Sequence, residues 1–171
     1  MNHRNSHTTA AVAVLTVSDS RSLQDDTSGA IVVDSLTAAG HAVASREIVR
    51  DVQTEIVSIV STWATDNAIH AIIVTGGTGP SQRDITPNAV IPLLSSTLPG
   101  FGELFRQLSY EEIGSAAFLS RAEAGWIDNE ETRTPIFLLP GAPKAVSLAL
   151  DRIIIPQLGH LLDVCSLESK R

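Results

Sequence analysis

The residues best suited to chemistry lie in one short segment, residues 72–87. The segment opens as an apolar, β-branched run, which is typical of a buried strand, and then becomes a loop rich in glycine and threonine. Glycine lets the backbone turn sharply and lets a ligand approach the main chain. The N–H groups of such a turn form a concave site for an anion, so we expect this loop to hold a phosphate group. The loop consists of Thr75, Gly76, Gly77, Thr78 and Gly79.

Two charged residues follow this glycine loop. Arg83 is a fixed positive charge, suited either to screening a phosphate or to an ordinary surface position, and Asp84 is a candidate metal ligand or base. Thr86 has the character of a helix N-cap and Pro87 that of a first helical residue. Because Thr86 is expected to cap the helix, Asp84 remains available for a ligand.

The segment matches neither of two common phosphate-binding motifs. No Gly-Lys-Ser/Thr follows the glycines, as a P-loop requires, and the third glycine of the dinucleotide fingerprint is missing. The full string Thr-Gly-Gly-Thr-Gly-Pro-x-x-Arg-Asp-x-Thr-Pro is much more specific than either fragment.

The elements that must position the loop alternate between strand and helix patterns. The clearest helix has Ile56, Ile59, Val60 and Trp63 on one apolar stripe. Such alternation predicts a single-domain α/β fold, a three-layer sandwich with a mainly parallel sheet. The expected strands cover residues 11–17, 41–49 (near an edge), 71–74, 121–127 and 135–139. The expected helices cover residues 27–39, a segment around 56–63, 88–94, 103–113 and one from 143 that Pro156 breaks or ends, with a turn at 98–102.

Ligands of such sheets bind beyond the carboxyl ends of the strands. Three expected strands end there in small or polar turns, which makes the residues of these turns candidate ligand contacts. Asp51 follows the second strand and either caps the next helix or faces the same edge, whereas Asp26 and Thr27 are expected to cap a helix. Lys144, near the start of the last helix, is a weaker candidate. Besides the glycine loop, the turns contribute Ser18, Asp19, Pro140 and Gly141.

Length and composition narrow the class of protein. The chain has 171 residues, a formal net charge of −7 and one cysteine. The length suits one domain, expected at residues 11–162, between a disordered leader (1–10) and a loose tail (163–171). We read His3 and His7 as part of the leader and not as metal ligands.

The negative charge argues against a nucleic-acid surface, and no apolar run reaches the roughly 18 residues of a membrane span. A lone cysteine favours a reducing compartment, and the start lacks the apolar core of a signal peptide, so we expect a cytoplasmic protein.

Taken together, the motifs resemble those of one known family. It resembles the MoaB/Mog family of molybdenum cofactor biosynthesis, the molybdopterin adenylyltransferase-like proteins, from about residue 11 to residue 161. The resemblance implies the molybdopterin-binding fold. The matching motifs are Leu15-Thr-Val-Ser-Asp19, Asp25-Asp-Thr-Ser-Gly29, Thr75-Gly-Gly-Thr-Gly79, Arg83-Asp-Ile-Thr-Pro87, Pro99-Gly-Phe-Gly-Glu103, Ser120-Arg-Ala122 and Leu139-Pro-Gly141.

The resemblance implies a reaction and a set of partners. In this family the terminal phosphate of molybdopterin attacks the α-phosphate of ATP with Mg²⁺ present, and pyrophosphate leaves. The aspartates of the family correspond to Asp84 and Asp51, which would hold the metal, and the glycine loop would hold phosphate. The family forms homotrimers or homohexamers and works with other proteins of the pathway. Two alternatives remain: a non-catalytic molybdopterin-binding or scaffold protein, and a different nucleotide chemistry of the CinA type.

Overall fold

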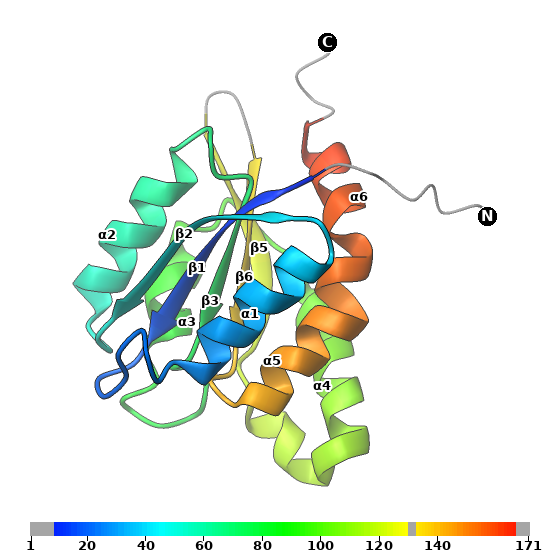
Figure 1. The fold of residues 1–171 in the computed structure, drawn as a ribbon. Helices are drawn as coiled ribbons and strands as arrows, with labels where there is room; N and C mark the ends of the chain where they lie inside the picture. Colours follow the sequence, from blue (N-terminus) through cyan, green and yellow to red (C-terminus); the bar gives the residue numbers. More distant parts are fainter. Residues whose placement is uncertain (1–8, 130–132, 167–171) are drawn as a thin grey trace, which may run out of the picture.

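One mixed sheet forms the centre of the computed structural model, which describes residues 9–129 and 133–166 (Figure 1). Within this described part, its strands are β1 (Ala11–Val17), β2 (Ala42–Val49), β3 (Ala71–Thr75), β4 (Ser96–Thr97), β5 (Glu123–Asp128) and β6 (Arg133–Leu139), in the order β2-β1-β3-β6-β5-β4. Strands β2, β1, β3 and β6 are parallel, and β5 is antiparallel to both of its neighbours. The prediction of a mainly parallel α/β sheet with the second strand at an edge is confirmed.

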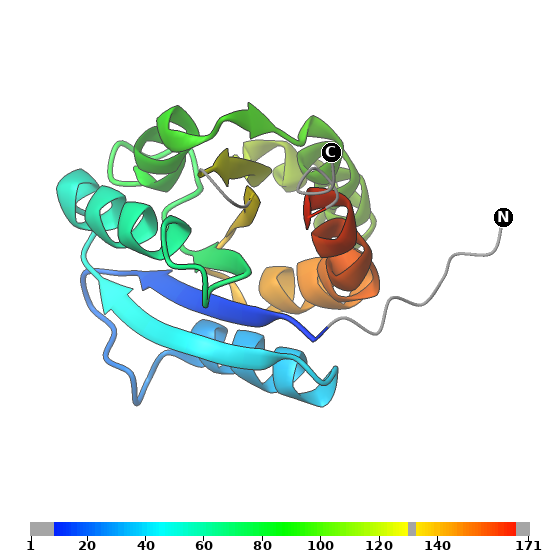
Figure 2. The ribbon, with the colours of Figure 1, turned by 90° about the horizontal axis from the view of Figure 1, so that it is seen from above.

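Helices cover both faces of the sheet. They are α1 (Thr27–Ala38), α2 (Gln53–Ala64), α3 (Thr86–Val90), α4 (Pro99–Ile113), α5 (Pro143–Ala149) and α6 (Ile155–Ser166), with short 3₁₀ turns at Ile91–Leu93 and Gly114–Leu119. One apolar core packs α1, α4, α5 and α6 against the sheet, and the other packs α2 and α3 against its opposite face. Figure 2 shows α1 and α2 on opposite sides of β1 and β2. The structure is therefore the expected three-layer sandwich.

The apolar strands explain this architecture. In β1, Val12 and Val14 belong to the core under α1, while Ala13 and Leu15 belong to the core under α2, and all four are fully buried. A parallel sheet that is covered on both faces needs strands that are apolar on both faces. The register pairs Thr16 with Thr75, so that β1 and β3 end side by side at one edge.

The final helix differs from the prediction. Pro156 does not end it, because α5, a π-helical segment at Leu150–Ile154 and α6 form one helix from Pro143 to Ser166. In the π segment the N–H of Ile155 donates to the carbonyl of Leu150, five residues earlier. Such a bulge moves the backbone away from the position where the proline ring would clash.

This helix also changes the expected domain limits. It continues to Ser166, so residues 163–166 are helical and not part of a loose tail. By length and mean hydropathy of 1.3 the helix is apolar enough to cross a membrane. Its buried side chains, among them Leu150, Ile154 and Leu158, pack into the core under α4 and β6, which accounts for its apolar composition.

Smaller differences occur elsewhere in the chain. Helix α4 begins at Pro99 and not at residue 103, because a proline suits the first turn of a helix. The two-residue strand β4 was not predicted. Ala10, expected in a disordered leader, is fully buried, and its N–H donates to Nδ1 of His41 at 3.1 Å. His3, His7 and residues 167–171 lie outside the described residues.

Candidate active site

A cavity of about 360 Å³ opens at the carboxyl ends of β1, β3 and β6. In Figure 1 this is the lower edge of the sheet, toward which β1 points. Most of the predicted contact residues line it, whereas Asp19, Asp51, Arg83 and Lys144 do not. The lining consists of Thr16, Val17, Ser18, Ser20, Arg21, Thr75, Gly76, Gly77, Thr78, Gly79, Asp84, Pro140 and Gly141.

The glycine loop needs its glycines for two reasons. Gly76 has a φ of +95° and Gly77 a φ of +64°, a backbone region that other residues rarely adopt. A Cβ on Gly76 would overlap the carbonyl oxygen of Val17, and one on Gly77 would lie 2.5 Å from Oγ1 of Thr86. The loop therefore packs its main chain directly against the end of β1 and the start of α3.

Thr86 holds the loop from the other side. Its Oγ1 donates to the carbonyl of Gly76 at 2.8 Å, and its N–H donates to the carbonyl of Gly77 at 3.1 Å. The prediction that Thr86 caps the helix is wrong, because α3 starts at Thr86 itself and has no side-chain cap. Its buried hydroxyl bonds a loop carbonyl instead, which satisfies a polar group that burial would otherwise leave unpaired.

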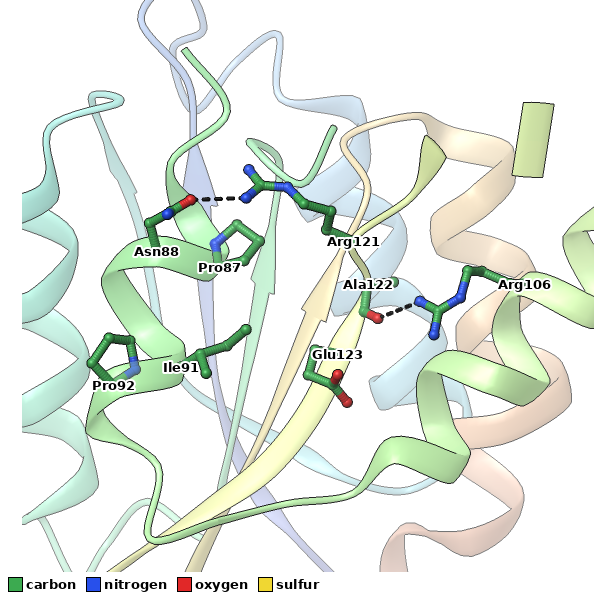
Figure 3. Close-up of a pocket in the computed structure, with 8 residues that line it drawn as sticks. All are labelled: Pro87, Asn88, Ile91, Pro92, Arg106, Arg121, Ala122 and Glu123. Atoms are coloured by element: carbon green, nitrogen blue, oxygen red, sulfur yellow. Dashed lines mark hydrogen bonds between the residues drawn. The ribbon is translucent and has the colours of Figure 1, made fainter. Parts of the chain in front are cut away.

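Arg121 is a site residue that sequence reasoning missed. Its N–H donates to the carbonyl of Thr78 at 2.8 Å and its Nε to that of Gly79 at 2.9 Å. Its Nη2 donates to the carbonyl of Asp84, and its Nη1 to Oδ1 of Asn88 at 2.8 Å (Figure 3). One guanidinium thus holds both ends of the segment that connects the glycine loop to Asp84. The Ser120-Arg-Ala122 motif was the feature of the sequence that could have indicated Arg121 as a site residue.

A second cavity of about 370 Å³ lies beside this clamp. Arg121, Asn88, Arg106 and Glu123 are among the residues that line it. Figure 3 shows Arg106 extended toward the carbonyl of Ala122, to which its Nη1 donates at 3.0 Å. Arg106 therefore bonds a main-chain carbonyl just before β5, whereas Arg121 bonds the carbonyls of Gly79 and Asp84.

Three carboxylates gather around the glycine loop. Asp84 accepts a hydrogen bond from the N–H of Ser81 at 3.0 Å, and a Cβ on Gly79 would lie 2.8 Å from its Oδ2. A Cβ on Gly77 would lie 3.0 Å from Oδ1 of Asp51. Burial raises the pKa of Asp51, and the negative charges of Asp19 and Asp84 raise it further. Asp51 and Asp84 thus lie close enough to repel each other, an arrangement that a cation would relieve.

The third carboxylate, Asp19, connects two loops. Its Oδ1 accepts from the N–H of Asp51 at 3.1 Å and its Oδ2 from Arg83 at 2.9 Å. The bond from Arg83 lowers the pKa of Asp19, as does the N–H of Asp51. The side chain of Arg83 is 80% exposed. The alternative that Asp51 caps α2 is wrong, because that helix begins after Val52 and has no side-chain cap.

The carboxylates Asp51 and Asp84 suit a metal ion whose other ligands come from the substrate and from water. Within the described part of the chain, no group of three or more His, Cys, Asp or Glu side chains is placed to hold a metal ion. Mg²⁺ is usually bound by one or two carboxylates, with water and substrate phosphates as the other ligands. The pair Asp51 and Asp84 beside the glycine loop fits that requirement and does not fit an all-protein metal cage.

A polar network forms the opposite wall. Nη1 of Arg21 donates to Oγ of Ser28 at 3.1 Å, and Oγ of Ser28 donates to the carbonyl of Gly141 at 2.7 Å. Asp26 caps α1 as predicted, accepting from the N–H of Gly29 at 2.9 Å. Burial favours the neutral form of Asp26, but the hydrogen bonds from Gly29, Thr16 and Arg46 outweigh it and lower its pKa.

Comparison with known proteins identifies the family to which this fold belongs. Residues 13–160 match the family described as "Probable molybdopterin binding domain". The chain is 45% identical over 150 residues to molybdenum cofactor biosynthesis protein B of Bacillus subtilis, covering 87% of this chain and 86% of that protein.

Two crystal structures extend the match to the fold. One, of a molybdenum cofactor biosynthesis protein B, has a TM-score of 0.87 and 39% identity, covering 92% of this chain and 96% of the other. The second is the tungsten cofactor synthesizing protein MoaB from Pyrococcus furiosus, with a TM-score of 0.83, 36% identity and coverage of 92% and 98%. With the glycine loop, its paired carboxylates and this fold in one molecule, the chain belongs to the MoaB/Mog family of molybdenum cofactor biosynthesis proteins.

Proposed function

We propose that the protein is a molybdopterin adenylyltransferase, which transfers AMP from ATP to the phosphate of molybdopterin and releases pyrophosphate. The observation that carries this proposal is the pairing of Asp51 and Asp84 beside the glycine loop, at a cavity of about 360 Å³. Two polyanions must meet in this reaction, and the cavity combines N–H donors for one with carboxylates for a metal that accompanies the other.

The residues of the site divide the work of the reaction. The backbone of Gly76, Gly77 and Gly79 binds phosphate oxygens, and the hydroxyls of Thr75 and Thr78 add donors. Ser18, Asp19, Pro140 and Gly141 contact the pterin or the nucleotide, and Arg83 screens phosphate charge from its exposed position. Asp51 and Asp84 would hold Mg²⁺, which would supply charge neutralisation for the reacting phosphates and help to align them.

The chemical step needs no strong base in the protein. A phosphate oxygen of molybdopterin is already ionised when it forms a bond to the α-phosphorus of ATP, and the bond from that phosphorus to the β-phosphate bridging oxygen breaks. Most of the rate then comes from holding the two phosphates in line and from charges arranged in advance. The clamp formed by Arg121 keeps the loop and Asp84 in register for this purpose.

An alternative is that the same cavity binds molybdopterin without turnover. The relatives that the chain matches favour this alternative, because their names state molybdenum cofactor biosynthesis and not the transfer of AMP. The test is pyrophosphate release from molybdopterin, ATP and Mg²⁺ by the wild type and by Asp84→Asn. The matched control is Asp34→Asn, which makes the same change at an exposed position of α1.

The two functions give different results in this assay. The adenylyltransferase predicts release by the wild type and the control, with a loss of at least about 100-fold in Asp84→Asn, since a metal is worth several kcal/mol of charge stabilisation. Binding of molybdopterin by all three proteins without pyrophosphate would contradict the enzyme and leave the binding protein.

We further propose that the protein works in the cytoplasm as a homotrimer or homohexamer, together with other proteins of the pathway. A group of exposed apolar side chains on α4 and in the turn after it supports assembly. The group consists of Leu104, Tyr110, Ile113, Phe118 and Leu119. Light scattering of Phe118→Ser against wild type tests this surface: a smaller particle is expected, and an unchanged particle would place the interface elsewhere.

A further inference from the structure

The cavity has charges of opposite sign on its two sides. Asp84 is the acidic residue and Arg21 the basic residue among the described side chains that line it. They come from elements on opposite faces of the sheet: Asp84 precedes α3, which packs in the core with α2, and Arg21 lies in the loop before α1, which packs in the other core. A ligand that spans the cavity therefore meets a carboxylate at one end and a guanidinium at the other.

Arg21 is held in place before any ligand arrives. Its N–H donates to Oγ of Ser18 at 3.3 Å, and its Nη1 donates to Oγ of Ser28 at 3.1 Å. Ser28 is in turn bonded to the carbonyl of Gly141, on the third loop of the cavity. Because its main chain is bonded to Ser18 and its side chain to Ser28, Arg21 loses little further freedom when it binds an anion.

The guanidinium also keeps donors for a ligand. Within the described residues, the hydrogen bond of its side chain uses Nη1, which leaves Nε and Nη2 for other acceptors. Asp26 does not need Arg21 as its counterion, since Arg46 is closer to it, at 3.1 Å against 3.8 Å. The side chain of Arg21 is 34% exposed, so its free donors can reach a ligand.

A hydroxyl of the same cavity points to the same kind of ligand. Oγ1 of Thr78 is buried without a hydrogen-bond partner among the described residues, and Thr78 is 2% exposed. A buried hydroxyl that lacks a partner costs stability and is satisfied by an acceptor that binds nearby. Phosphate oxygens are acceptors for both the hydroxyl and the guanidinium.

We infer that Arg21 binds the phosphomonoester group of the pterin substrate, opposite the carboxylates that take the metal-bound phosphates of ATP. The inference rests on the proposed function and assigns the two phosphates of that reaction to opposite ends of the cavity. A phosphomonoester carries up to two negative charges and suits a guanidinium with free donors. The nucleotide phosphates need the metal, which belongs on the side of Asp84 and Asp51.

The test measures molybdopterin binding without ATP or metal, by equilibrium ultrafiltration and fluorescence of the oxidised pterin. Arg21→Gln is expected to weaken binding by about 10- to 100-fold, the effect of losing a charged hydrogen bond. Arg21→Lys retains the charge and recovers part of that loss. Arg152→Gln is the matched control, an exposed arginine outside the cavity lining, and binds as the wild type does.

A second ligand locates the effect at the phosphate. Molybdopterin from which a phosphatase has removed the phosphate is expected to bind wild type and Arg21→Gln equally. In turnover, Arg21→Gln is expected to raise KM for molybdopterin and leave KM for ATP within about twofold. Equal loss of binding for both ligands, or no loss for either, would overturn the inference.

Failure of this inference and failure of the proposed function give different results. Binding that depends on Arg21 and on the phosphate, with no turnover by the wild type, would remove the adenylyltransferase and keep the assignment of Arg21. Turnover by the wild type, with molybdopterin binding that Arg21→Gln leaves unchanged, would keep the enzyme and remove the assignment.

Discussion

Replacing Gly76 by alanine tests how closely the glycine loop approaches the end of β1. Gly76 has a φ of +95°, and a Cβ at this position would overlap the carbonyl oxygen of Val17, a main-chain atom that cannot rotate away. Gly40 provides the matched control, because its φ is +84° but a Cβ there has nothing within 4 Å. The two substitutions share the backbone strain and differ in the contact.

The expected magnitudes follow from these two terms. A left-handed backbone costs an alanine about 1–2 kcal/mol, and forcing an atom into packed structure costs about 1–3 kcal/mol more. Gly40→Ala should therefore lower the free energy of unfolding by about 1–2 kcal/mol and Gly76→Ala by about 2–5 kcal/mol. Because the gain from restricting the unfolded chain is common to both variants, it cancels in the comparison. At about 2–4 °C per kcal/mol for a chain of this size, Gly76→Ala should lower Tm by about 4–20 °C.

Urea unfolding of the three proteins at one protein concentration measures these differences. A Gly76→Ala variant no less stable than Gly40→Ala would refute the close packing of the loop on β1, and with it the geometry of the cavity. Gly100→Ala adds a second control: a Cβ there meets nothing within 4 Å and φ is not positive, so this variant should be as stable as wild type or up to about 1 kcal/mol more stable.

Three further predictions concern the side chains around the loop. Arg121→Lys should lower stability by about 1–3 kcal/mol and turnover by about 10- to 100-fold. The reason is that the ammonium group of lysine cannot reproduce the hydrogen bonds from the guanidinium to the carbonyls of both Gly79 and Asp84. Unchanged Tm and kcat would contradict the role of Arg121 as a clamp. Asp51→Asn should raise Tm at pH 7 while abolishing turnover. The pKa of Asp51 is raised in the folded protein, so ionisation of Asp51 lowers stability as the pH rises through that pKa. The difference in Tm between the variant and the wild type should therefore vanish below about pH 4, where Asp51 is protonated in both states. Asp26→Asn should cost about 3 kcal/mol or more at pH 7, because it breaks a buried ion pair. The folded pKa of Asp26 is lowered, so this difference should persist down to about pH 4 and shrink below it, as thermal unfolding across pH would show.

The parts of the fold that were predictable are those that local sequence determines. Apolar strands, the stripe on α2 and the left-handed stop at Gly40 depend on side chains within one element. Because the carboxyl ends of parallel strands meet at one edge, most of the cavity lining followed from the residues at which the expected strands end. Ser18, Thr75 and Gly141 are brought together in this way.

The parts that were not predictable depend on contacts between distant segments. Arg121 lies about forty positions from the loop carbonyls that it holds, and no local pattern indicates which arginine does so. Thr86 has the sequence of a helix cap, but a loop carbonyl within reach takes its hydroxyl. Pro156 normally ends a helix, and packing of the last helix on the sheet allows a π segment instead. In each case tertiary structure outweighs a local preference.

Detection of the pterin product by mass spectrometry tests the central claim most directly. Molybdopterin, ATP and Mg²⁺ are mixed with the wild type, with Asp84→Asn and with the control Asp34→Asn, and the products are quantified. The adenylyltransferase predicts one AMP-containing pterin for each pyrophosphate in the wild type and the control, and neither product in Asp84→Asn. Pyrophosphate without adenylylated pterin, or equal product in Asp84→Asn, would contradict the role assigned to this site.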